Sequence, residues 1–149
     1  MHSIIRVLLL TACLLMLAAC DGPFIFMAGG ELSGTVSSVP DTWQLEKDSA
    51  VAQLETRPEE PYSINFSYVQ LNGRFYVYAG DTRTNWVQHI EQNPLVRVRV
   101  DATIYPARAV RVTSDDELTE FAAVWTSLSA FQRNPLSFEE VWLYRLETR

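Results

Sequence analysis

The sequence predicts a mainly β domain of about six or seven strands with two short helices, arranged either as a mainly antiparallel α+β fold or as a small β-barrel. Three observations lead to this prediction. Most of the apolar runs are short enough to be strands, and tight turns join most of them. Two further segments carry apolar residues at helical spacing. A barrel also hides the sheet edges that so many short strands would otherwise expose.

Residues 1–19 have the organisation of a secretory signal. Arg6 precedes an apolar run at 7–17, which is too short to span a hydrocarbon core of ~30 Å. The run leads into Leu17-Ala18-Ala19-Cys20, which resembles the bacterial lipobox. The resemblance implies that the signal is removed and that acylated Cys20 anchors the protein in a lipid bilayer. The alternative is a plain signal peptide with a coincidental cysteine.

Residues 20–30 predict a lipidated tether in the cell envelope. Asp21 resembles the signal that retains lipoproteins in the inner membrane, which favours that membrane with the protein facing the periplasm; the outer membrane is the alternative. Gly22-Pro23 and Gly29-Gly30 are typical of a linker. Residues 24–27 are unusually apolar for a linker, and we expect them either to lie in the membrane interface or to dock on the domain.

Residues 31–149 form the predicted domain, because a chain of 149 residues leaves room for one ordinary domain. The net charge of −6 argues against binding to nucleic acid, which requires a basic surface. Cys13 lies in the predicted signal and Cys20 in the predicted anchor, so no thiol remains for a disulfide, a nucleophile or a metal site.

The first half of the domain is predicted to consist of strands. We expect strands at 31–36 and 51–55, and a third strand at 62–71. The third strand alternates until Tyr68 and then changes phase, which suggests a bulge or a strand that bends around a barrel. Asn72-Gly73 predicts a two-residue hairpin turn into a further strand at 75–79.

A short helix is expected at 81–93, with Asp81 or Thr82 as its N-cap and Asn93-Pro94 as its end. Trp86, Val87 and Ile90 share one face of this helix. The strand that follows at 95–101 alternates clearly. Its valines face inward: Val96, Val98 and Val100.

The remaining elements are a strand at 104–113, a second helix and a final strand at 141–146. Pro106 suggests an edge position, because proline cannot donate a ladder hydrogen bond. Ser114 and Glu117 form a capping box that opens the second helix.

Candidate catalytic groups are few. His89 is the single histidine outside the predicted signal, and it has no partner at metal-ligand spacing, so a structural or surface role is favoured and no metal site is expected. Four arginines fall on neighbouring predicted strands: Arg97, Arg99, Arg108 and Arg111. They suggest either an anion site or cross-strand ion pairs, and the ion pairs are favoured.

Residues 75–100 carry a family resemblance. An aromatic strand (Phe75-Tyr76-Val77-Tyr78), a polar turn, a short helix ending in Asn93-Pro94 and a valine-rich strand resemble the split-barrel flavin-binding superfamily of pyridoxamine-phosphate-oxidase-like and deazaflavin-dependent nitroreductase-like proteins. Tyr105-Pro106-Ala107-Arg108-Ala109 resembles the partner strand of that family. The resemblance extends over about 62–125. It implies a split barrel of the flavin-reductase or FMN-binding type and a homodimer with the cofactor between protomers.

The resemblance also implies a site at the start of the first helix. Arg83, Thr84 and Asn85 would contact the phosphate of FMN or a deazaflavin, and Trp86 would lie beside the ring. The pair of basic residues that the oxidase-like branch carries in this turn is absent. The sequence names no catalytic residue. Two hypotheses therefore remain: a membrane-anchored flavin-type oxidoreductase, or a non-catalytic envelope lipoprotein that binds no cofactor and uses the barrel to bind an unidentified protein.

Overall fold

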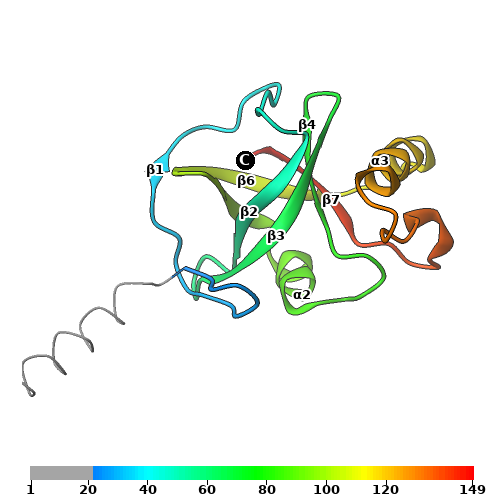
Figure 1. Ribbon diagram of the computed structural model, residues 1–149. Coiled ribbons are helices and arrows are strands. Elements are labelled where there is room, and N and C mark those ends of the chain that lie inside the picture. Colours follow the sequence, from blue (N-terminus) through cyan, green and yellow to red (C-terminus); the bar gives the residue numbers. More distant parts are fainter. Residues whose placement is uncertain (1–21) are drawn as a thin grey trace, which may run out of the picture.

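The computed structural model describes residues 22–149 (Figure 1). The predicted signal, Cys20 and Asp21 lie outside the described residues. The elements follow one another as β1 (Thr35–Val36), β2 (Ser49–Thr56), β3 (Tyr62–Leu71), β4 (Arg74–Tyr78), α2 (Asn85–Gln92), β5 (Leu95–Val100), β6 (Thr103–Arg111), α3 (Asp115–Leu128), the 3-10 helix η1 (Pro135–Ser137) and β7 (Leu143–Thr148).

Strands β2 to β7 form a closed antiparallel barrel. The strand order is β1-β6-β5-β2-β3-β4-β7, and an additional pairing of β6 with β7 closes the sheet on itself. The two-residue β1 adds to the outside of β6 in parallel orientation. The predicted fold class, an antiparallel barrel with two short helices, is confirmed.

The main core fills the barrel. Alternation along β5 places three valines inside, as the sequence predicts, with exposures of 2%, 0% and 8% for Val96, Val98 and Val100. Helix α2 lies across one end of the barrel (Figure 1), and its Trp86, Val87 and Ile90 belong to the same buried cluster. The short helix therefore acts as an end plug of the barrel.

A second core lies between the outside of the barrel and α3. It contains Val69 of β3, Tyr76 of β4, Leu143 of β7 and Phe121 of α3. This cluster explains the change of phase after Tyr68, because β3 is covered on both faces at that point. The pairing of β3 with β2 and with β4 runs without interruption, so the predicted bulge is absent from this strand.

The hairpin at Asn72-Gly73 is confirmed. Both residues have positive φ values, 52° and 72°, as a two-residue hairpin turn requires. Gly73 is also closely packed: a Cβ there would lie 2.5 Å from Thr42 Cγ2. The Gly73 carbonyl accepts a hydrogen bond from Trp43 N, so the turn holds the preceding loop against the barrel.

Two predicted boundaries are wrong. Residues 31–34 are not a strand, because their pairing partner on β6 begins at Thr103 and reaches only β1. The first helix starts at Asn85 rather than at 81, with Thr84 in place of Asp81 or Thr82 as N-cap. The backbone of Ala79 and Gly80 still pairs with Trp142, which extends the sheet contact and delays the helix.

Two further predictions are partly confirmed. Ser114 Oγ accepts from Glu117 N at 3.4 Å, but the Glu117 carboxylate bonds to Arg145 and Tyr76 instead of returning to the cap. Pro106 pairs with β5 on one side, whereas on its other side it falls between the residues that pair with β1 and those that pair with β7. Proline is therefore placed at a local edge inside a closed barrel.

Within residues 22–149, none of the helices combines the length and apolar character needed to cross a bilayer.

Candidate functional site

The residues predicted at the start of the first helix lie together beside the barrel. Thr84, Asn85 and Trp86 line a cleft of about 360 Å³. The walls come from three parts of the chain. From β3 they are Tyr62, Ile64 and Asn65, and from the segment before the barrel they are Ile25, Phe26 and Met27.

Thr84 is the most informative residue of this cleft. It is the N-cap of α2, yet its side chain makes no capping hydrogen bond. Its Oγ1 is buried and has no hydrogen-bond partner among the described residues. The first backbone amides of a helix also lack partners within the helix and favour an anion. Thr84 thus offers an unused polar group next to a group of amide donors.

Arg83 is not among the residues that line the cleft. Its Nε donates to Glu91 Oε2 at 2.7 Å, so the guanidinium is directed along α2. Sequence reasoning grouped Arg83 with its neighbours. The structure brings three of the four residues together and pairs the fourth elsewhere.

Trp86 belongs mainly to the core. It is 7% exposed, and its ring lies 6.0 Å from the ring of Tyr144 inside the barrel. Only a small part of the indole reaches the cleft. Tyr62, which is partly exposed on β3, also lines the cleft.

His89 occupies a structural position on α2. Its Nδ1 lies 2.9 Å from Thr56 Oγ1, and its ring packs edge-on against Tyr62. Burial lowers the pKa of His89, and the nearby Arg57 lowers it further. Within residues 22–149, no group of three or more His, Cys, Asp or Glu side chains is placed to hold a metal ion.

The apolar turn (residues 24–27) docks on the domain through its backbone. Phe24 and Met27 exchange backbone hydrogen bonds of 3.1 and 2.8 Å. Asn65 Nδ2 donates to the Ile25 carbonyl at 3.0 Å, and Gly29 pairs with Ser63 of β3. The four side chains of the turn are between 60% and 101% exposed.

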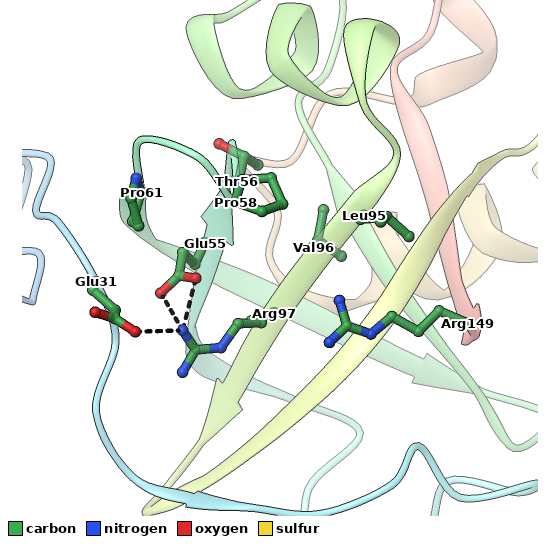
Figure 2. A pocket seen from close by; sticks show the side chains of 9 residues that line it. All are labelled: Glu31, Glu55, Thr56, Pro58, Pro61, Leu95, Val96, Arg97 and Arg149. Atoms are coloured by element: carbon green, nitrogen blue, oxygen red, sulfur yellow. Dashed lines mark hydrogen bonds and ion pairs between the residues drawn. The ribbon is translucent and has the colours of Figure 1, made fainter.

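Arg97 lines a separate pocket of about 230 Å³ beside β2 and β5. Figure 2 shows its guanidinium beside the carboxylates of Glu31 and Glu55. Glu55 is 3% exposed and also accepts from Leu32 N at 2.6 Å. The arginine is therefore used to neutralise a buried carboxylate and to hold the chain before β1.

The other strand arginines are also dispersed. Arg99 donates to the carbonyls of Asp101 and Ser33. Arg111 lies over the Trp142 ring at 3.8 Å and donates to the Val141 carbonyl. The favoured interpretation, cross-strand ion pairs, is confirmed for Arg97, which pairs with Glu55 of β2. Arg111 also lies 3.8 Å from Glu140, whereas Arg108 lies opposite Glu147 without an ion pair among the described contacts. These contacts bring the four arginines to no common anion site.

Sequence reasoning missed a charged cluster around Glu117. Its carboxylate accepts from Tyr76 Oη at 2.7 Å and from Arg145 Nη1 at 2.6 and 2.7 Å. Burial raises the pKa of Glu117, but hydrogen bonds from Arg145 and Tyr76 outweigh it and hold the pKa below its ordinary value. Burial, together with the bond to Glu117, raises the pKa of Tyr76 to about 12. The sequence signal that could have indicated this cluster was the aromatic and charged side chains at outward positions of β4 and β7, which include Tyr76 and Arg145.

No family model matches the chain, and no curated protein matches its sequence. Among solved structures, the chain resembles a Listeria innocua protein assigned as a pyridoxamine 5'-phosphate oxidase, with a TM-score of 0.52. The fold is a split barrel. The match covers 66% of this chain and 83% of the other, at 12% sequence identity. The structural match establishes the shared fold. At so low an identity, any chemistry has to be argued from the site residues of this chain.

Proposed function

We propose that the protein is a lipid-anchored envelope protein whose split barrel binds FMN or a deazaflavin in the cleft beside α2 and acts as an oxidoreductase. The unused Thr84 Oγ1 is the observation that carries this proposal, since buried polar atoms are nearly always hydrogen-bonded. The cleft combines this hydroxyl and the helix amides, which suit a phosphate, with apolar walls that suit a planar ring. The name of the Listeria innocua neighbour supports the same ligand class.

The cofactor would supply the redox chemistry, and this chain would bind and orient it. Thr84 and Asn85 would hold the polar end, and Tyr62 and Ile64 would contact the ring. A homodimer would complete the site, as the family resemblance implies. Acylated Cys20 would hold the protein in the inner membrane facing the periplasm, which Asp21 favours over the outer membrane.

The test is to purify the full chain from membranes, record its absorption spectrum, and measure thermal shifts with FMN, FAD and a deazaflavin. We expect bound flavin to be released on denaturation. Thr84→Val, which removes one hydrogen bond, should weaken FMN binding about fivefold. The matched control is Thr82→Val, because Thr82 is exposed and outside the cleft. Colourless protein with no shift for any of these cofactors would contradict the proposal.

The pairing of Arg83 with Glu91 favours a second candidate, a binding or assembly module without a cofactor. In that case the cleft would receive a protein segment. Crosslinking in intact envelopes would then recover one partner protein. Neither the parent protein nor the Thr84→Val variant would show measurable flavin binding.

A further inference from the structure

The apolar turn (residues 24–27) exposes an unusual amount of apolar surface for four consecutive residues. Phe24, Ile25, Phe26 and Met27 are 64%, 60%, 101% and 64% exposed. Large exposed apolar patches in soluble domains mark a surface that contacts a partner or a membrane. The question is which of these covers the turn.

Part of the backbone of the turn is paired within the protein. Phe24 and Met27 bond to one another, and the Ile25 carbonyl accepts from Asn65. An unsatisfied backbone group costs several kcal/mol in an apolar medium, so a turn with internal pairs enters lipid far more readily than an open loop. The pair between Gly29 and Ser63 fixes the turn to β3, so its side chains project from a rigid base.

The cleft that the turn borders is lined by uncharged side chains. The nine residues that line the cleft behind it include no Asp, Glu, Lys or Arg side chain. Phe131 provides the contrast: it is 95% exposed but lies in a cleft with Asp81 and Arg133. Moving the lining of this cleft into a bilayer interface would therefore transfer no charged side chain out of water, whereas moving the lining of the Phe131 cleft would transfer Asp81 and Arg133.

The position of the turn in the chain selects the membrane as its occupant. Only four residues, 18–21, separate the apolar run at 7–17 from Gly22. Aromatic and aliphatic side chains next to a membrane attachment are typical of interfacial anchors. Figure 1 places this segment on the same side of the barrel as α2, away from α3.

We propose that the apolar turn inserts its side chains into the interfacial region of a lipid bilayer and so holds the barrel with its α2 cleft toward the membrane. The turn is a second point of attachment, distinct from the acyl group. The inference rests on the proposed anchoring at Cys20 for delivery of the turn to the bilayer, and it does not depend on a bound cofactor.

The test uses the full chain reconstituted into phosphatidylcholine vesicles, with plain or brominated acyl chains. Phe26→Trp and Phe131→Trp form a matched pair, since both positions are almost fully exposed and both changes keep an aromatic residue. The readout is the fluorescence that each variant adds to that of the four native tryptophans. Bromine should reduce the added fluorescence of Phe26→Trp by at least about twofold and leave that of Phe131→Trp unchanged, as expected for insertion of one side chain only.

Equal quenching of both variants, or none at Phe26→Trp, would overturn the inference. A blue-shifted emission of Phe26→Trp without quenching would also overturn it, because it would indicate contact with protein, such as a second copy of the chain. Mass analysis of the N-terminal peptide tests acylation of Cys20 separately. If Cys20 is acylated but Phe26→Trp is not quenched, the proposed anchor is supported and the insertion of the turn is rejected. Flavin titration tests the proposed cofactor independently.

Discussion

Arg97 and Arg83 each pair with a glutamate, but in different environments. The distance from Arg97 to Glu55 is 3.0 Å and that from Arg83 to Glu91 is 2.7 Å. The Glu55 side chain is 3% exposed, whereas Glu91 is 32% and Arg83 56% exposed. Water screens the shorter pair, while the carboxylate of the longer pair is shielded from water. Burial rather than distance therefore decides which pair the fold depends on.

Glu117 stands between these two cases. Its side chain is 12% exposed, and it accepts from both Tyr76 and Arg145. The three glutamates thus form a series of increasing exposure in one barrel. If burial controls their contributions, removing them should destabilise the protein in the order Glu55, Glu117 and Glu91.

The largest effect is expected for Glu55→Ala. The change leaves Arg97 and the Leu32 amide without their shared acceptor, which should lower the free energy of unfolding by about 3 kcal/mol. Urea unfolding followed by tryptophan fluorescence measures it. Glu31→Ala is the matched control, because Glu31 pairs with the same arginine but is 68% exposed, and it should cost less than about 0.5 kcal/mol. Similar losses for both variants would contradict the role of burial.

Glu117→Gln should have an intermediate effect that depends on pH. The folded state lowers the pKa of Glu117 from its ordinary 4.5, so the ionised carboxylate stabilises the fold above that value. We expect a loss of about 2 kcal/mol at pH 7, since hydrogen bonds to a charged group are broken. This difference between variant and parent should shrink as the pH falls below 4.5 and through the folded-state pKa. A difference that stays constant between pH 7 and pH 3 in urea unfolding would show that charge is not the cause.

The smallest effect on stability is expected for Arg83→Gln, at less than about 0.5 kcal/mol. Because the exposed pair with Glu91 contributes little free energy, separating it would allow Arg83 to turn toward a phosphate bound in the neighbouring cleft. The variant should then weaken FMN binding about tenfold and leave riboflavin, which has no phosphate, unaffected. Titrations with the two flavins measure this difference. A stability loss close to that of Glu55→Ala would invalidate the comparison.

The parts of the fold that sequence predicted well depend on local rules. The alternation of β5 and the Asn72-Gly73 turn each reflect the geometry of neighbouring residues. The predicted bulge in β3 was wrong because the cover on Val69 comes from Phe121, far along the chain on α3. The alternative, a strand that bends around a barrel, agrees with the fold. The start of α2 was placed too early because the pairing of Ala79 and Gly80 with Trp142 is also non-local.

The candidate site also contains residues that a local pattern located and residues whose placement depends on non-local contacts. Thr84, Asn85 and Trp86 are neighbours in sequence at the start of a helix, so one local pattern located them together. Arg83 was grouped with them because sequence cannot choose between a rotamer toward the cleft and one toward Glu91. The wall formed by Phe26 was not predicted as part of the site, because it depends on the docking of a distant segment onto Asn65.

The backbone pair between Gly29 and Ser63 sets a limit on reach. If the chain is anchored at Cys20 as proposed, this pair leaves only residues 20–29 as a tether between the bilayer and β3. Even fully extended, such a tether would measure about 30 Å, and the turn would shorten it further. On an anchored chain the barrel would stay within a thin layer above the bilayer, so any substrate or partner would have to come to the membrane surface to meet it.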